Sequence, residues 1–152
     1  SAYQVTGDKE LLETAGRLAQ WIAETPPGTC ETHENAWYHA YSTGPGKEGT
    51  YAGKYGRAVS FLLTMFVATG DDAYLEKART LADEAVEKLF DNGLFRGHPA
   101  KPYYESIDGV GYLLYSLLQL ECVLEHPESV LAEKAITIDD GHAKIVVPLE
   151  NW

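Results

Sequence analysis

The stretch Thr69-Gly70-Asp71-Asp72-Ala73-Tyr74-Leu75-Glu76-Lys77-Ala78-Arg79-Thr80-Leu81-Ala82 repeats a pattern that stands 63 positions earlier in the chain. Its first three residues match Thr6-Gly7-Asp8, and five further positions within 12–19 are identical in the same register. Apolar residues at i, i+3, i+4 and i+7 predict amphipathic helices over about 8–24 and 72–90. Eight identities in one helix-length register indicate an internal repeat.

Each amphipathic segment is followed by a segment that is apolar on nearly every side, at about 55–68 and 107–124. The two apolar segments also match, because Gly56 aligns with Gly111 and Leu62-Leu63 aligns with Leu117-Leu118. A helix without a polar face belongs in the interior of a structure. The sequence therefore predicts helices in the order outer, inner, outer, inner, with repeats at about 6–68 and 69–126.

The predicted fold class is all-α, with two α/α hairpins and a short C-terminal β-hairpin. The β-hairpin signal is a pair of β-branched runs, 135–138 and 144–147, around Asp139-Asp140-Gly141-His142. A lone two-stranded hairpin is marginal in water, so we expect it to lean on the helices or on sequence outside this chain. The predicted division is a helical domain over 1–126 and a linker with the hairpin over 127–152.

The composition limits the partners of this chain. Twelve Lys and Arg face 23 Asp and Glu, which gives a net charge of −11. Nucleic acids and anionic membranes attract clustered cations, so neither is an expected partner. No apolar run is long enough to span a bilayer. Ten Tyr and three Trp suit carbohydrate, whose rings stack on aromatic faces.

The only cysteines, Cys30 and Cys122, show no zinc-ligand spacing, and their pairing stays open. His33 and His39 with Glu34 do not form a recognised metal motif, so we predict no metal and no cofactor.

Chemistry-bearing residues gather in the connections that lead into the inner helices. The connection over 26–53 is rich in His and aromatic residues, and loops of that length are commonly functional. The stretch 103–112 supplies Glu105, Asp108 and three tyrosines just before the second inner helix. Because both inner helices follow such a connection, their N-termini should meet at one end of the structure.

The alternating helices, the outer motif TGD-x-x-(Y/L)-L-E-x-A-x-x-L-A and the Gly-rich acidic entry to the inner helix resemble the α/α toroids of carbohydrate enzymes. This six-hairpin glycosidase superfamily includes unsaturated glucuronyl and rhamnogalacturonyl hydrolases, N-acylglucosamine epimerases and similar polysaccharide lyases. The resemblance covers about residues 3–125. Two hairpins are too few for a ring of six, so it implies part of a longer chain, self-association, or a small domain that shares the repeat.

The resemblance implies a carbohydrate substrate, a uronate-containing oligosaccharide among the candidates, and a glycoside hydrolase as the leading activity. Asp108 and Glu105 are the expected acid and base, since paired carboxylates can divide these roles. The simpler interpretation is that Ser106 or Asp108 caps the helix and that Glu105 is solvated. The residues expected to bind substrate are His33, Trp37, Tyr38, Tyr55, Arg57, His98 and Tyr104.

Two other functions stay open at this point. A uronate lyase would neutralise the substrate carboxylate and remove the adjacent proton, for which Asn35, His33, His39, Tyr38 and Arg57 are candidates. A non-catalytic helical domain would bind glycan or protein through the same aromatic connections. Arg57 lies on an apolar helix, and unpaired buried charge is costly, so a salt bridge to Asp108 or Glu105 is its alternative role.

Overall fold

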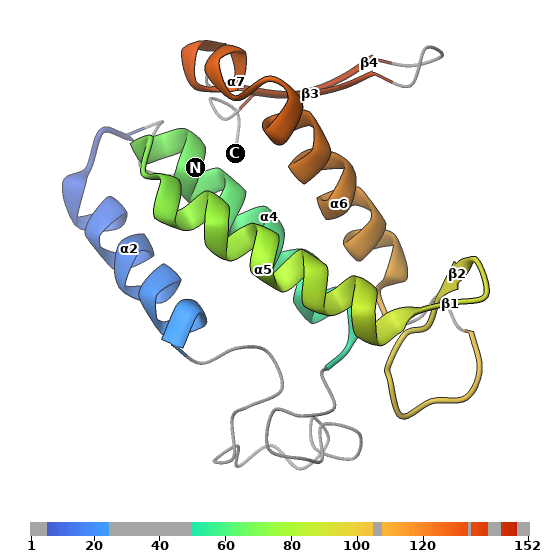
Figure 1. Ribbon diagram of the computed structural model, residues 1–152. Coiled ribbons are helices and arrows are strands. Elements are labelled where there is room, and N and C mark those ends of the chain that lie inside the picture. Colours follow the sequence, from blue (N-terminus) through green and yellow to red (C-terminus); the bar gives the residue numbers. More distant parts are fainter. Residues whose placement is uncertain (1–5, 25–49, 105–107, 134, 140–143, 149–152) are drawn as a thin grey trace.

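The computed structural model describes residues 6–24, 50–104, 108–133, 135–139 and 144–148, and these form a mostly helical protein with a small antiparallel β-hairpin (Figure 1). In chain order the elements are α2 (Lys9–Glu24), α4 (Ala52–Thr69), α5 (Asp72–Leu89), β1 (Phe90–Asp91), β2 (Leu94–Phe95), α6 (Val110–Glu125), α7 (Pro127–Glu133), β3 (Ala135–Asp139) and β4 (Lys144–Pro148). The four predicted helices are confirmed, with ends within three residues of the expected ones. The sequence also predicts a short helical turn at about 35–40, and these positions lie outside the described residues.

The Thr-Gly-Asp motif folds in the same way in both repeats. Gly7 and Gly70 both have positive φ, 68° and 73°. The following aspartates cap α2 and α5: Asp8 accepts a hydrogen bond from the Glu10 amide at 2.9 Å, and Asp71 accepts one from the Ala73 amide at 3.0 Å. Side-chain caps of this kind satisfy amides that the helix leaves open. The sequence repeat is therefore also a repeat of local structure.

Helix α4 is the centre of the protein. It packs against α2, α5 and α6, and ten of its residues are buried. Leu62, Leu63 and Phe66 are almost fully shielded from water. The outer helices α2 and α5 turn small residues such as Ala19, Ala78 and Ala82 toward α4. The prediction of α4 as an inner helix is confirmed.

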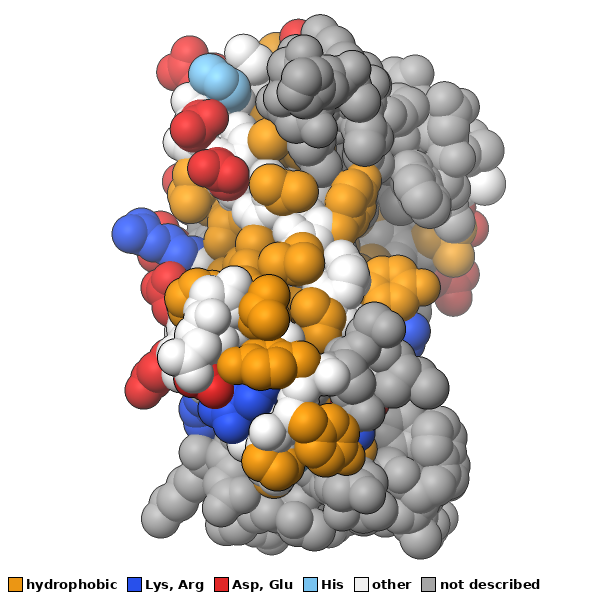
Figure 2. Space-filling view, turned by 90° about the vertical axis from the view of Figure 1, so that its right-hand side faces the viewer, with side chains coloured by type: hydrophobic (Ala, Val, Ile, Leu, Met, Phe, Trp, Pro, Cys, Tyr) orange, Lys and Arg blue, Asp and Glu red, His pale blue; other side chains and the backbone are white. Residues whose placement is uncertain are grey.

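The prediction that α6 is buried on all sides is wrong. One face packs on α4 through Leu113, Leu120 and Val123, but Leu114 and Leu118 on the other face are 44% and 46% exposed. Figure 2 looks onto the side of the molecule that carries α6 and shows hydrophobic side chains along the middle of that face. The sequence pattern alone requires burial, but no described element covers this face.

The segment after α5 is a hairpin and not a simple helix cap. Asn92 and Gly93 have φ of 49° and 84°, and strands β1 and β2 pair around them, with Phe90 opposite Phe95. An Asn-Gly pair with positive φ at both residues is the favoured two-residue hairpin turn. The sequence at Asn92-Gly93 also fits a helix C-cap and predicts that α5 ends there, but this prediction is wrong, because α5 ends at Leu89 with Phe90 as its cap.

The C-terminal hairpin forms as predicted, with Ile136 opposite Val147 in the antiparallel pair β3–β4. Strand β3 packs on α6 and α7, and Ile136 joins the helical core with 1% of its surface exposed. Helix α7 was not predicted, although Pro127 is well suited to a first helical turn. Within the described residues, none of the helices has the length and apolarity that a membrane span requires.

Candidate functional site

The N-termini of α4 and α6 lie against each other, as the sequence predicts for the inner helices. The Gly53 amide donates a hydrogen bond to the Asp108 carbonyl at 2.9 Å. A β-carbon at Gly56 would stand 2.6 Å from the backbone of Tyr112 and Leu113, so only glycine allows this approach. Both helix starts are thereby fixed at the same end of the molecule.

Asp108 belongs to a shielded ion pair at this junction. Its carboxylate accepts a hydrogen bond from the Lys101 ammonium at 2.6 Å, and the two side chains are 14% and 10% exposed. Gly97 lies against the carboxylate, because a β-carbon there would be 2.6 Å from the β-carbon of Asp108. The expected cap role of Asp108 is wrong, since Gly109, with φ of 79°, is the N-cap of α6 without a side-chain cap bond.

A tyrosine and a histidine complete the cluster. The rings of Tyr51 and His98 are 4.7 Å apart between centroids. The ammonium groups of Lys101 and Lys54 lie 5.4 Å and 5.8 Å from the centroid of the Tyr51 ring, within the range of cation–π attraction. We call these five residues, Tyr51, Lys54, His98, Lys101 and Asp108, the rim cluster.

The segment 96–101 is fixed to the start of α4, which holds the rim cluster in place. The Ala52 amide donates to the Gly97 carbonyl at 2.9 Å. The Ala100 amide donates to Nδ1 of His98 at 3.1 Å, so this nitrogen is an acceptor and a neutral ring carries its proton on Nε2. His98 is 1% exposed, so its ring packs against Tyr51 and is not accessible to a ligand.

The rim cluster concentrates positive charge in an acidic protein. Lys54, Lys101 and nearby Arg57 make up three of only twelve Lys and Arg in the chain. The N-terminal ends of α4 and α6, which carry partial positive charge, meet at the same place. Asp108 offsets one of these charges, so the four side chains together carry a formal charge of +2, in contrast to −11 for the whole chain.

Two more of the residues expected to bind substrate, Arg57 and Tyr104, are described by the structure. Arg57 is exposed, with its guanidinium carbon 5.2 Å from the centroid of the Tyr112 ring. Its alternative role as the salt-bridge partner of Asp108 is wrong, because Lys101 pairs with that carboxylate, and Glu105 lies outside the described residues. Tyr104 is 44% exposed and donates to the Asp91 carbonyl at 3.0 Å. Tyr103 and Tyr112 are 50% and 58% exposed, so aromatic faces are open to solvent around the rim cluster.

Tyr55 does not line the site, contrary to the prediction. It is fully buried between α4 and α5, where its hydroxyl donates to the Glu84 carboxylate at 2.6 Å. Burial is the main cause that raises the pKa of Tyr55 well above the usual range of a tyrosine, and the nearby Glu84 carboxylate adds to it. Tyr55 is a core residue that joins an inner helix to an outer one.

This buried hydroxyl predicts a change in stability at alkaline pH. In the unfolded chain Tyr55 loses its proton near pH 10, whereas the folded protein retains it, so the free energy of unfolding falls as pH rises above about 10. Tyr55→Phe should cost about 1 kcal/mol at pH 8 through the lost hydrogen bond. Above pH 10 that difference should shrink and then reverse. Urea unfolding of both proteins from pH 8 to 11 tests this, and a constant difference would contradict it.

Six predicted residues lie outside the described part of the chain. They are Glu105, His33, Asn35, Trp37, Tyr38 and His39. The structure therefore neither joins them to the rim cluster nor separates them from it.

Three members of the rim cluster were not predicted, namely Tyr51, Lys54 and Lys101. Lysine is the commonest kind of solvated residue, so neither lysine stands out in the sequence. The one usable signal was position, because Lys54 lies in the first turn of inner helix α4 and Lys101 in the segment that leads into inner helix α6. Lys101 is notable only in three dimensions, where 8% of its surface is exposed.

The described residues contain no group of three or more His, Cys, Asp or Glu placed to hold a metal ion. The rim cluster offers three chemical groups: the Asp108 carboxylate paired with the Lys101 ammonium, the Tyr51 phenol with lysines near its ring, and the buried His98 imidazole.

No family model, curated protein or solved structure matches this chain. Functional inference therefore rests on the site itself.

Proposed function

We propose that this chain is a domain of a carbohydrate-active enzyme of the α/α-toroid type, and that the rim cluster binds the sugar. The observation that carries the proposal is the convergence of Tyr51, His98, Lys101 and Asp108 where α4 and α6 begin. Aromatic faces and charged groups that fix hydroxyl or carboxylate substituents are the elements of a sugar subsite. The toroid assignment itself rests on analogy of the repeat.

In the favoured reaction, a glycoside hydrolysis, Asp108 acts as one carboxylate of the acid/base pair. Asp108 accepts a hydrogen bond of 2.6 Å from Lys101, which suits the ionised carboxylate of such a pair. That carboxylate accepts a proton or stabilises positive charge that develops on the sugar. Glu105, three positions earlier, is the proposed partner that donates the proton. Exposed Tyr103, Tyr104 and Tyr112 supply stacking surfaces beside them.

A uronate lyase is the second candidate, and the arrangement around Tyr51 favours it. Lys54 and Lys101 lie 5.8 Å and 5.4 Å from the centroid of the Tyr51 ring, so positive charge that could neutralise a uronate carboxylate stands beside a phenol. That phenol would then remove the proton next to the carboxylate. This pathway uses residues of the rim cluster and does not need Glu105.

A glycan array followed by mass spectrometry of incubated hits tests the proposal. Hydrolysis adds one water to the products, elimination creates an ultraviolet-absorbing double bond, and a binding domain retains the glycan unchanged. We expect Asp108→Asn to lower turnover at least about a hundredfold, the usual scale of acid/base catalysis, while leaving the fold intact. Asn keeps an oxygen that can accept from Lys101.

Asp83→Asn is the matched control, because Asp83 is an exposed carboxylate on α5. It should leave turnover unchanged. Full turnover in Asp108→Asn would remove Asp108 from the mechanism, and failure of the chain to retain any glycan would end the proposal.

A further inference from the structure

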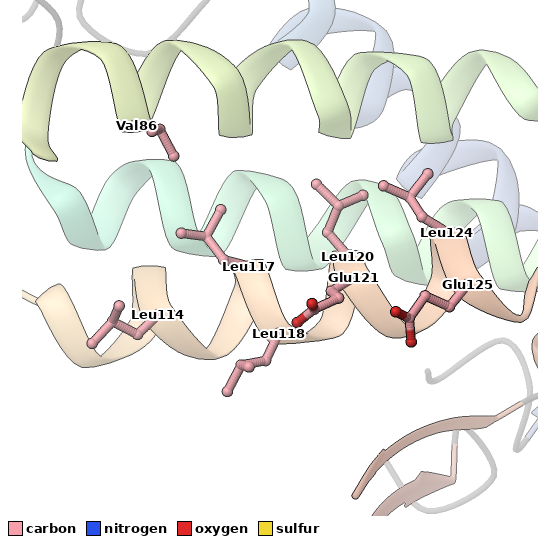
Figure 3. A pocket seen from close by; sticks show the side chains of 8 residues that line it. All are labelled: Val86, Leu114, Leu117, Leu118, Leu120, Glu121, Leu124 and Glu125. Carbon is pink, nitrogen blue, oxygen red and sulfur yellow. The ribbon is translucent and has the colours of Figure 1, made fainter. Parts of the chain in front are cut away.

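The exposed face of α6 forms an open apolar groove with a volume of about 620 Å³ (Figure 3). Val86 of α5 stands on one side of it. Leu114, Leu118 and Leu124, each close to half exposed, project from α6, and Glu121 and Glu125 add carboxylates toward its C-terminal end. A contiguous apolar surface of this kind marks a contact site more often than a solvated surface. We call it the α6 groove.

The internal repeat indicates what the α6 groove receives. With Gly56 aligned to Gly111, groove residues Leu114 and Leu118 correspond to Val59 and Leu63 of α4. Both α4 residues are fully buried, and they belong to the core that α5 and α6 share with α4. The α6 groove is therefore the repeat equivalent of a surface of α4. On α4 that surface is covered by the hairpin that α5 and α6 form.

The complementary surface is present on α2. Leu11, Leu18 and Trp21 are 39%, 47% and 50% exposed along one side of this helix. In the 63-residue register the first two correspond to Tyr74 and Leu81 of α5. Leu81 is 1% exposed, and both side chains pack in the core that contains α4. We call the α2 residues the α2 stripe.

The third residue of the α2 stripe supports the same correspondence. Trp21 corresponds to Glu84, which accepts the hydrogen bond from Tyr55 of α4. Leu81 and Glu84 thus face the preceding hairpin's inner helix, and the Tyr74 hydroxyl lies near Gly16 of its outer helix, α2. In α2 the same positions face solvent, because the described residues contain no hairpin that precedes this one.

We infer that a second copy of this chain docks head to tail, with its α2 stripe in the α6 groove of the first copy. The contact repeats between chains the packing of the second hairpin, α5 and α6, on α4 that exists once within the chain. The contact is heterologous, since the two surfaces differ. An open assembly therefore keeps one unoccupied α6 groove at one end and one unoccupied α2 stripe at the other. The inference does not depend on the proposed sugar site.

Charge opposes this association and predicts its salt dependence. Each copy carries a net charge of −11, and Glu121 and Glu125 stand at the groove itself. Like charges on approaching copies repel one another. Salt screens this repulsion over distances longer than the Debye length, which is about 10 Å in 0.1 M salt. Association driven by apolar contact should therefore strengthen as salt is added.

Sedimentation equilibrium of the purified chain over a range of concentration and salt tests the inference. We expect concentration-dependent assembly that salt strengthens. Leu118→Lys, in the α6 groove, and Leu18→Lys, in the α2 stripe, should each weaken self-association at least tenfold. Leu94→Lys is the matched control, because Leu94 is a 57% exposed leucine on β2, outside both surfaces, and it should assemble like the unchanged protein.

Mixing the two variants gives the decisive result. Leu118→Lys retains its α2 stripe and Leu18→Lys retains its α6 groove, so an equal mixture should form a one-to-one heterodimer that does not grow further. A monomer at every concentration and salt would overturn the inference, as would a mixture that fails to associate. Continued dimerisation of Leu18→Lys alone would overturn it too, because the groove would then pair with its own copy. Circular dichroism checks folding, and Leu118→Ser with Leu18→Ser replace any lysine variant that unfolds.

Discussion

Gly56→Ala should lower the free energy of unfolding by about 3 kcal/mol, at the upper end of the usual cost of overpacking. The added methyl group would stand 2.6 Å from the backbone nitrogen of Leu113 and from the backbone of Tyr112. Backbone atoms cannot rotate away as a flexible side chain can, so α4 and α6 would have to separate at their N-termini. The loss should appear in urea unfolding followed by circular dichroism.

Gly111→Ala is the matched control, at the repeat-equivalent position of α6. Among the described residues, and apart from the backbone of α6 itself, no atom lies within 4 Å of a β-carbon placed at Gly111. Alanine should therefore stabilise the helix by about 0.5 kcal/mol, the lower end of the usual gain over glycine, because Gly111 lies in the first turn of α6. Opposite signs at the two glycines would confirm that close helix contact, and not glycine content, matters at this junction. A small effect of Gly56→Ala would show that the inner helices are not in backbone contact.

Asp108→Ala should have the second largest effect on stability, about 2–3 kcal/mol. Removing one partner of a buried ion pair leaves the other charge without compensation and commonly costs 3–5 kcal/mol. We reduce this figure because the Lys101 and Asp108 side chains keep 10% and 14% of their surface in water. The free energy of unfolding at neutral pH measures the loss.

Two companion variants separate the ion pair from other causes. Lys88→Met removes a more open pair, in which the Lys88 and Glu84 side chains are 21% and 24% exposed and lie 3.7 Å apart one turn along α5. Its loss should cost no more than about 0.5 kcal/mol. Adding Lys101→Met to Asp108→Ala should recover most of the loss, because no uncompensated charge remains. If Asp108→Ala cost as little as Lys88→Met, the pair would not be shielded at the junction.

The helices were predictable because their signals are local. Helix α5 carries its own apolar stripe and its own cap at Asp71, so its N-terminus was placed correctly. The turn at Asn92-Gly93 also had a local signal, but two meanings were consistent with it. A helix C-cap and a hairpin turn both require positive φ, and only the pairing of Phe90 with Phe95 decides between them.

The candidate site was predictable only in location. The sequence brings the starts of the inner helices to one end, and the bond from the Gly53 amide to the Asp108 carbonyl agrees with that. It did not show that Lys101 would be the partner of Asp108, because that choice depends on how the segment 96–101 crosses the start of α4. Tyr55 was assigned to the wrong surface, since one turn of helix decides whether a residue faces the rim or the core.

By itself the sequence determined the repeat, the positions of the helices, the terminal hairpin and the acidic character of the chain. These follow from spacing, capping and composition, which act over a few residues or over the whole chain at once. Only the tertiary structure decided which side of α6 is exposed, which cation pairs with Asp108 and which aromatic residues meet Lys54 and Lys101. Those outcomes depend on how closely two helices can approach, and that is set by the packing of residues distant in sequence, such as Gly56 against Leu113.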